Sequence, residues 1–277
     1  MVYGDTVLVT GASSGVGKSI AQMLMENGYK VYGTTRKPVE PGSQITYGKK
    51  NKKGFIEMVA LDVRSEDSVK KAVEYIVKKE GKIDVLINNA GIGIAGAVED
   101  TATEEAYEQF DTNFFGVLRV CRSVIPIMRM SRNGLIINIS SVAGLISIPF
   151  QSMYSASKYA LEAISEALRI ELKPFGINVV LVEPGDMKTG FTWNRKIVKA
   201  ANNDSAYKEQ FAKSLNTMIK DEMSGPPPDI VANTVMKLLR IKKPPVRVVV
   251  GIKYKIIVFL KRILPARFVE YVVSSIY

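Results

Sequence analysis

The sequence contains no histidine among its 277 residues. Ser-His-Asp catalysis, Cys-His catalysis and histidine-ligated metal centres all need an imidazole, so these three kinds of site are excluded. Catalysis must instead use tyrosine, lysine, serine, asparagine or carboxylate side chains, and we expect no metal site. The single cysteine, Cys121, cannot form an internal disulfide. We interpret it as a buried structural thiol in a chain suited to a reducing cytoplasm.

Long apolar segments are also missing. The longest wholly apolar run near the C-terminus, residues 256–260, is far shorter than the roughly 20 residues that a membrane-spanning helix needs. The first residues show neither the basic segment nor the apolar core of an export signal. The sequence therefore predicts a cytoplasmic protein that does not cross a membrane.

What is present fits one globular domain spanning residues 1–277, with 47% apolar and 23% charged residues. Segments of helical periodicity alternate with seven β-branched runs, at residues 6–10, 31–35, 55–63, 83–88, 135–140, 177–182 and 246–250. Several runs are apolar on consecutive residues, which favours parallel strands covered on both faces. We predict an α/β fold: a single-domain, Rossmann-like, doubly wound parallel sheet of about seven strands with helices on both faces.

Two segments interrupt this alternation. Residues 37–54 are predicted to form an exposed basic loop, which contains four clustered lysines, Lys49, Lys50, Lys52 and Lys53. Residues 185–228 show no strand pattern and end in three prolines. We expect this second segment to form a substrate lid within the domain.

The positive charge is concentrated at the C-terminus. The net charge is +11, and residues 236–277 carry ten Lys or Arg side chains against one acidic residue, Glu270. Residues 252–277 are predicted to form a basic amphipathic extension. We favour its packing on its own domain or on a second subunit. Peripheral contact with an anionic membrane is an alternative that is not favoured, and nothing in the sequence supports nucleic-acid binding.

A glycine-rich turn follows the first predicted strand, where Gly11, Gly15 and Gly17 precede helical sequence. Glycines let backbone N–H groups approach a pyrophosphate, and a helix N-terminus adds partial positive charge. About 20 residues further on, an acidic side chain would bind a ribose 2′-hydroxyl. Here the sequence has Thr35 and Arg36. A guanidinium can pair with a 2′-phosphate, so NADP(H) is predicted rather than NAD(H).

A second motif follows the fifth predicted strand. Tyr154 and Lys158 lie four residues apart in a predicted helix, so their side chains project from one face. A tyrosine has an ordinary pKa of about 10, and we expect the nearby ammonium and an oxidised nicotinamide to lower the pKa of Tyr154. Tyr154 would then serve as a base near neutral pH. Ser141 ends the preceding strand.

Together these motifs resemble the short-chain dehydrogenase/reductase family, in its ordinary branch. Some segments of the sequence are similar to those of the steroid- and retinol-dehydrogenase-like subgroup. The resemblance implies a catalytic tetrad of Asn113, Ser141, Tyr154 and Lys158. It implies cofactor contacts from Gly11, Ser13, Ser14, Gly15, Val16, Gly17, Arg36, Asp62, Val63, Asn89, Ala90, Gly91, Tyr154, Lys158, Pro184, Gly185 and Thr189.

The expected activity is NADP(H)-dependent hydride transfer between nicotinamide and an uncharged, moderately hydrophobic ketone, aldehyde or alcohol, with Tyr154 as general acid/base. The predicted substrate contacts are Ser141, Leu145, Tyr154, Met187 and Phe191, because this wall is mainly apolar. A 3-oxoacyl-thioester reductase is the alternative enzyme. The alternative that is not an enzyme is a catalytically inactive nucleotide-binding sensor or scaffold. The resemblance also implies a homodimer or homotetramer.

Overall fold

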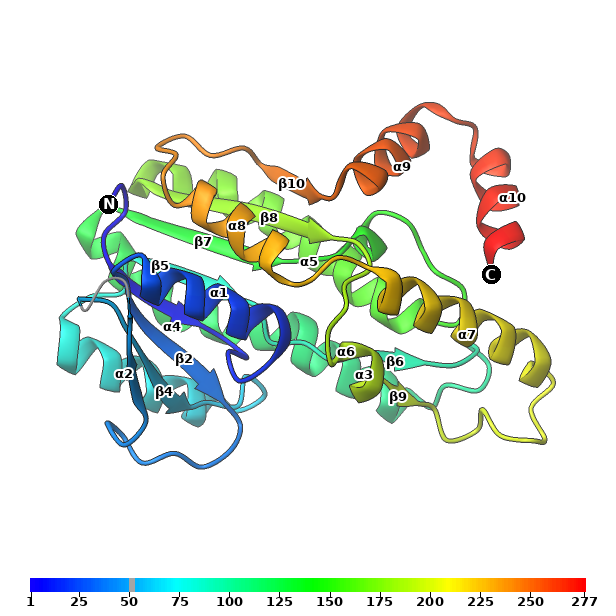
Figure 1. The fold of residues 1–277 in the computed structure, drawn as a ribbon, viewed down its shortest axis with the longest axis horizontal. Helices are drawn as coiled ribbons and strands as arrows, with labels where there is room; N and C mark the ends of the chain where they lie inside the picture. The colour runs from blue at the N-terminus through cyan, green and yellow to red at the C-terminus, as the bar shows by residue number, and fades with distance from the viewer. Residues whose placement is uncertain (50–52) are drawn as a thin grey trace.

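The computed structural model describes residues 1–49 and 53–277, so Lys50 and Lys52 of the predicted basic loop lie outside the described residues. Its centre is an eight-stranded sheet in the order β10-β8-β7-β5-β1-β2-β4-β3. The strands are β1 (Thr6–Val9), β2 (Lys30–Thr35), β3 (Ile45–Tyr47), β4 (Phe55–Ala60), β5 (Val85–Asn88), β7 (Gly134–Ile139), β8 (Ile177–Pro184) and β10 (Arg247–Val250). All seven predicted strands are present and pair in parallel (Figure 1).

The chain reverses its winding direction at β1. Strands β2 and β4 lie on one side of β1, and β5, β7, β8 and β10 lie on the other. Loops leaving the carboxyl ends of β1 and β5 therefore diverge and leave a crevice between them. The fold places the glycine-rich turn and the segment after Asn88 at the two sides of this crevice.

Helices cover both faces of the sheet. They are α1 (Gly15–Glu26), α2 (Glu66–Glu80), α3 (Thr103–Phe110), α4 (Gly116–Ser131), α5 (Ser152–Leu172), α6 (Phe191–Asn194), α7 (Lys208–Ser224) and α8 (Asp229–Leu238), with a π-helical turn η1 (Asp111–Phe115) and 3-10 turns η2 (Val142–Gly144) and η3 (Lys173–Phe175). Val7 and Val9 pack with α1 and α8, whereas Leu8 packs with α2, α4 and α5. Alternating strand residues thus build two cores, as both-face burial predicts.

Two short pairings were not predicted. β3 lies inside the predicted loop 37–54 and pairs antiparallel with β4 at the sheet edge. β6 (Ile94–Ala95) pairs with β9 (Lys196–Ile197), which belongs to the predicted lid 185–228. Runs of two or three residues show too little alternation to be recognised in a sequence.

The C-terminal extension consists of α9 (Ile252–Ile263) and α10 (Ala266–Ile276). Both helices project beyond the end of β10, away from the sheet (Figure 1). Within the described residues, no helix is both long enough and apolar enough to cross a membrane.

Candidate active site

The glycine-rich turn has a backbone that only small residues permit. Gly11 and Gly15 have φ angles of 66° and 53°, in the left-handed region. A Cβ on Gly17 would lie 2.3 Å from the carbonyl oxygen of Gly11 and 2.4 Å from Nδ2 of Asn89. The turn is therefore packed tightly against the end of β5, and its backbone is left without side chains that would block a phosphate group.

Hydrogen bonds join this turn to the loop after β5. The Asn89 side chain donates to the carbonyls of Thr10 and Gly11, at 2.9 and 3.1 Å. The backbone N–H groups of Asn89 and Ala90 both donate to the Thr10 hydroxyl, at 2.9 and 3.0 Å. These bonds span 78 to 80 residues of sequence and hold the two sides of the crevice at a fixed separation.

Basic side chains lie at one end of the cleft, in the segments that follow β2 and β4. Arg36 is exposed and lines the cleft, as predicted for the 2′-phosphate end of the cofactor. Arg64, which sequence reasoning missed, also lines it and binds the Asp62 carboxylate through Nε and Nη2, with the shortest contact at 2.6 Å. This hydrogen bond is the main reason that the pKa of Asp62 is lowered. The carboxylate is therefore charge-compensated rather than free to repel a phosphate.

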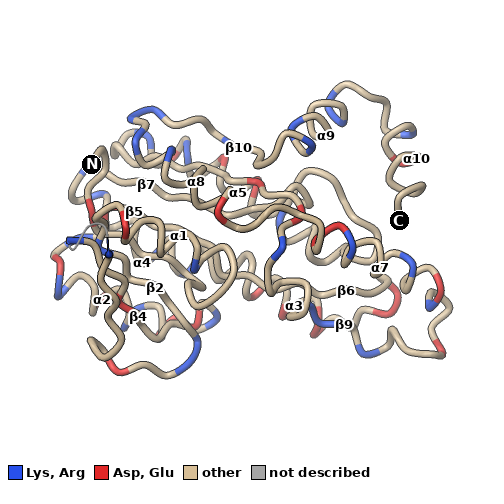
Figure 2. Tube along the Cα trace, in the orientation of Figure 1, with Lys and Arg blue, Asp and Glu red and all other residues tan. Residues whose placement is uncertain are grey.

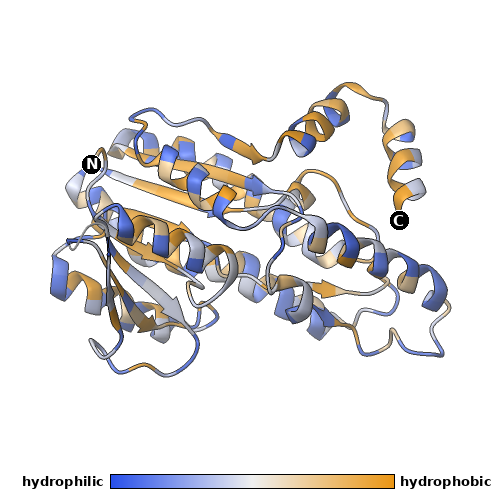
Figure 3. Ribbon diagram, in the orientation of Figure 1, coloured by the Kyte–Doolittle hydropathy of each residue, from blue (hydrophilic) through white to orange (hydrophobic). Residues whose placement is uncertain are grey.

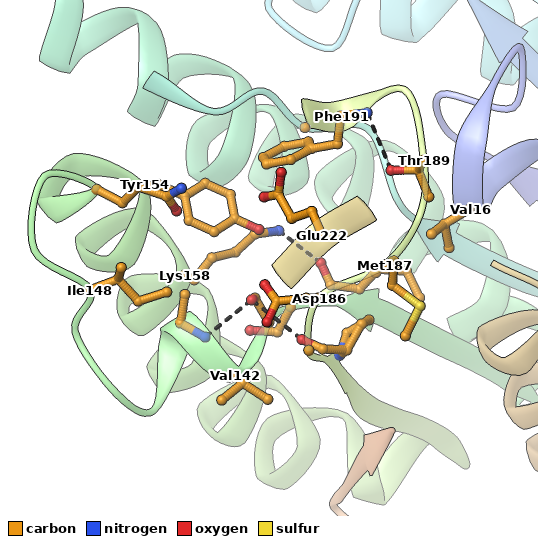
Figure 4. Close-up of a pocket in the computed structure, with 18 of the residues that line it drawn as sticks. Val16, Val142, Ile148, Tyr154, Lys158, Asp186, Met187, Thr189, Phe191 and Glu222 are labelled. Carbon is orange, nitrogen blue, oxygen red and sulfur yellow. Dashed lines mark hydrogen bonds between the residues drawn. The ribbon is translucent and has the colours of Figure 1, made fainter. Parts of the chain in front are cut away.

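Tyr154 and Lys158 line the same cleft (Figure 4), and so does Ser141; the cleft has a volume of about 550 Å³. Lys158 Nζ lies 5.7 Å from the centroid of the Tyr154 ring and donates a 2.9 Å hydrogen bond to the Ile139 carbonyl. The Ser141 hydroxyl accepts from the N–H of Ala143 at 3.1 Å. The tyrosine and lysine thus share one helix face, as their spacing predicts.

Burial dominates the pKa of the Tyr154 phenol in the chain alone. Burial raises the pKa of Tyr154 to about 12, and the nearby Ser141 hydroxyl opposes that shift. Burial also lowers the pKa of Lys158 to about 8. Desolvation is the largest cause of this shift in the chain alone. The prediction invoked the Lys158 ammonium together with an oxidised nicotinamide, so for the protein with its dinucleotide bound it stays a prediction. A raised pKa favours the protonated phenol, which is the form that can donate a proton.

Asn113 lies behind the cleft wall in the π-helical turn η1. It is buried, its side-chain oxygen accepts from the N–H of Ile92 at 2.9 Å, and its Nδ2 donates to the Ser157 hydroxyl at 3.2 Å. Single π-helical turns often occur at functional sites. Asn113 therefore fixes the loop after β5 against α5, the helix that carries Tyr154.

The cleft collects most of the predicted site residues. The predicted cofactor residues that line it are Gly11, Ser13, Ser14, Gly15, Val16, Arg36, Asp62, Val63, Asn89, Ala90, Gly91, Tyr154, Lys158, Pro184, Gly185 and Thr189. The substrate candidates Ser141, Tyr154, Met187 and Phe191 also line it. Gly17 and Leu145 lie outside this lining. Gly17 is buried against Asn89, and the Leu145 carbonyl accepts a hydrogen bond from Lys261.

The end of the cleft that was predicted to bind the substrate is less apolar than expected. The carboxyl groups of Asp186 and Glu222 line it, and Figure 4 shows Glu222 beside Tyr154 and Phe191. Glu222 forms a buried ion pair with Arg195, whose side chain is 2% exposed. Burial raises the pKa values of both Asp186 and Glu222. No local motif marks Arg195 and Glu222 as a pair, because they are 27 residues apart and meet only in the folded lid.

Helices α9 and α10 form a roof over this predicted substrate end, and the sequence did not reveal this arrangement. The roof residues that line the cleft are Tyr254, Ile257, Leu260, Lys261, Leu264, Phe268, Val269, Val272, Val273, Ile276 and Tyr277. Tyr254 is packed so closely on the backbone of Gly185 that a Cβ there would lie 2.2 Å from its ring. The contact between Tyr254 and Gly185 shows that α9 packs on its own domain. The apolar roof residues extend the cleft with an apolar chamber.

Comparison with known proteins identifies the family to which this architecture belongs. Residues 5–199 match the family model for short chain dehydrogenase. The chain is 47% identical to 3-ketodihydrosphingosine reductase of Bacteroides thetaiotaomicron, over 88% of this chain and 87% of that protein. It is 34% identical to an NADPH-dependent 3-dehydrocapnine reductase of Ornithobacterium rhinotracheale, over 89% and 88%.

A solved structure points to the same family. A short-chain dehydrogenase from Streptomyces avermitilis matches with a TM-score of 0.80 and 30% identity, covering 94% of this chain and 92% of that one. The family model covers well over half of the chain, and the glycine-rich turn, the tyrosine and the lysine stand in one cleft. The chain is an oxidoreductase and belongs to the short-chain dehydrogenase/reductase family.

Proposed function

We propose that this protein is an NADP(H)-dependent carbonyl reductase whose substrate is a long-chain ketone. The observation that carries the proposal is the continuity of the cleft. Tyr154 and Lys158 stand in the middle, the glycine-rich turn and Arg36 lie at one end, and the apolar roof of α9 and α10 lies at the other. A pocket with a few polar groups at its centre and an apolar extension fits a ketone attached to a hydrocarbon chain.

The glycine-rich turn fits a dinucleotide, because its glycines carry no side chains that would block a phosphate group. At Gly17 there is no room for a side chain. Arg36 and Arg64 support NADP(H) over NAD(H), since both guanidinium groups line the cleft beyond the turn. Bound NADPH would supply the hydride for the carbonyl carbon. The residues of this chain then have to orient the ketone and deliver a proton to its oxygen.

Ser141 would donate a hydrogen bond to the carbonyl oxygen and stabilise the negative charge that develops there. Tyr154 would donate its proton to the same oxygen, because its raised pKa keeps the phenol protonated until charge develops. Lys158 would stabilise the phenolate that remains, and Asn113 would position α5 against the loop after β5. The products are the alcohol and the oxidised dinucleotide.

The reductase of Bacteroides thetaiotaomicron is named for its substrate, and that substrate is the first compound to test. Because the chain is 47% identical to a 3-ketodihydrosphingosine reductase, we propose 3-ketodihydrosphingosine as the candidate substrate. Its long hydrocarbon chain would occupy the space beneath α9 and α10. The 3-oxoacyl-thioester reductase remains an alternative that the same assay separates.

The experiment follows NADPH oxidation with 3-ketodihydrosphingosine, with a short water-soluble ketone and with a 3-oxoacyl thioester. We expect the highest kcat/KM for the long-chain ketone. Tyr154→Phe should lower kcat by about 10² to 10⁴-fold and leave NADPH binding intact. Tyr107→Phe, at an exposed position on α3, is the matched control. NADPH binding without turnover of any carbonyl by the wild type would favour the inactive sensor instead.

A further inference from the structure

Helix α9 has two apolar faces, and only one of them is covered. Its inner face carries Ile257 toward the cleft and the buried Val258 toward the protein. Its other face carries what we call the outer stripe, which consists of Ile252, Ile256, Phe259, Leu260 and Ile263. These side chains are between 41% and 78% exposed. Their spacing of four, three, one and three residues puts them on a single side of a helix.

Basic side chains border the outer stripe on both sides. With about 100° of rotation per residue, Lys253 falls along one edge of the stripe, and Lys255 and Arg262 fall along the other. All three are exposed. Figure 2 shows Lys and Arg positions along α9, and Figure 3 shows apolar positions in α9 and α10, in the same projecting part of the molecule.

Helix α10 carries further exposed apolar residues. Phe268, Tyr271, Val272 and Ile276 are exposed, and none of its residues is buried. Its charged residues are Arg267 and Glu270. Exposed apolar residues of this size are normally scattered singly over a soluble protein, whereas here nine of them lie in two consecutive helices.

We propose that the outer stripe of α9, together with the exposed apolar residues of α10, docks on an anionic lipid surface. An apolar helix face with lysine and arginine along its edges matches a bilayer interface, where the apolar side chains enter the acyl boundary and the cations meet lipid phosphates. A second copy of this chain is a poorer partner, because its Lys253, Lys255 and Arg262 would face the same cations. The contact is peripheral, lying in the plane of the interface.

The docking surface is continuous with the cleft. Leu260 belongs to the outer stripe and also lines the cleft, and Phe268, Val272 and Ile276 of α10 are both exposed and part of the lining. A hydrocarbon chain could therefore pass from the lipid to Tyr154 along apolar side chains. This last step rests on the proposed function, whereas the docking itself does not.

The test measures flotation of the full chain with vesicles, without substrate or cofactor. The vesicles are phosphatidylcholine alone or phosphatidylcholine mixed with phosphatidylserine, at low salt and at about 1 M salt, where the screening length falls to about 3 Å. We expect binding to the anionic vesicles at low salt. Ile256→Glu/Phe259→Glu should lower the bound fraction about tenfold or more, since both changes put carboxylates in the interface.

Two further variants separate surface from fold. Met130→Glu/Ile170→Glu changes apolar residues that are 80% and 75% exposed elsewhere, and it should bind vesicles like the wild type. Lys253→Gln/Lys255→Gln/Arg262→Gln should bind more weakly and with less salt dependence. Circular dichroism and thermal unfolding check that each variant is folded.

The proposal is overturned by any of three results: no binding of the wild type to anionic vesicles, equal loss in the two Glu double variants, or equal binding to neutral and anionic vesicles. It is also overturned if sedimentation velocity shows a dimer that Ile256→Glu/Phe259→Glu dissociates, because a second copy then covers the stripe. Vesicle binding requires no turnover, so failure of the proposed enzyme activity would leave this result unaffected.

Discussion

Tyr254 on α9 donates a 2.5 Å hydrogen bond to the Asp186 carboxylate in the segment after β8. The same tyrosine ring covers Gly185, so the roof of the cleft is attached to the segment that carries the predicted cofactor residues. At its other end, α9 is held by Lys261, which donates to the Leu145 carbonyl and to the Tyr159 hydroxyl. The roof is therefore anchored to both walls of the cleft.

Tyr254→Phe should loosen this roof. The change removes a hydrogen bond to a partly buried carboxylate, for which we expect a loss of about 1.5 to 3 kcal/mol in the free energy of unfolding. Limited proteolysis should cut residues 252–277 faster than in the wild type, and the KM for a long-chain ketone should rise more than kcat falls. Tyr271→Phe, on the exposed side of α10, is the control. Unchanged proteolysis would contradict the anchoring role.

Arg36→Asp should weaken NADPH binding by about tenfold to a hundredfold, because it replaces a guanidinium that can pair with a 2′-phosphate by a carboxylate that repels it. NADH binding should change little. Fluorescence titration with both dinucleotides measures the ratio. Arg122→Asp, an exposed arginine on α4, controls for the change in net charge. If Arg36→Asp binds NADPH as tightly as the wild type does, the preference for NADP(H) must be assigned elsewhere.

Gly17→Ala should disrupt the dinucleotide cradle. Its Cβ would meet the Gly11 carbonyl at 2.3 Å, and overpacking of this kind costs about 1 to 3 kcal/mol of stability. We expect NADPH affinity to fall beyond what this loss of stability explains. Gly81→Ala is a suitable control, because its φ of 73° strains the backbone but nothing lies within 4 Å of the new Cβ. Equal NADPH affinity in the two variants would argue against the cradle.

Stability should depend on pH through Glu183. This side chain of β8 is fully buried, and burial raises its pKa in the folded protein from 4.5 to about 8. Between these values the folded state binds more protons than the unfolded state, so the free energy of unfolding should fall as pH rises. Glu183→Gln should flatten this slope in urea unfolding from pH 5 to 8, and Glu74→Gln on the exposed side of α2 should not. An unchanged slope would assign the pH dependence to other groups.

The repeating parts of the fold were predictable from the sequence. Consecutive apolar β-branched residues identified all seven parallel strands. At the start of α2, the Ser65 side chain accepts from the N–H of Ser68, which is the contact expected of a helix cap. Most of the cofactor residues that the family resemblance implies line one cleft. Cys121 is buried, as interpreted, and burial raises its pKa to about 12.

Features that depend on distant contacts were not predictable. The roof requires Tyr254 to meet a residue 68 positions earlier, and no periodicity encodes that meeting. The helical spacing gave the proximity of Tyr154 to Lys158 but not the degree of burial, which raises the pKa of Tyr154 in the chain alone. Arg64 was overlooked because an arginine two residues after a motif resembles any surface charge until the Asp62 contact is seen.

The buried pair of Arg195 and Glu222 restricts how this lineage can diversify. Loss of either side chain alone would leave an unpaired charge buried beside the cleft, a change that commonly costs about 3 to 5 kcal/mol. A change at this position would therefore have to arise by concerted replacement of both residues, so descendants that differ here should have exchanged the two together.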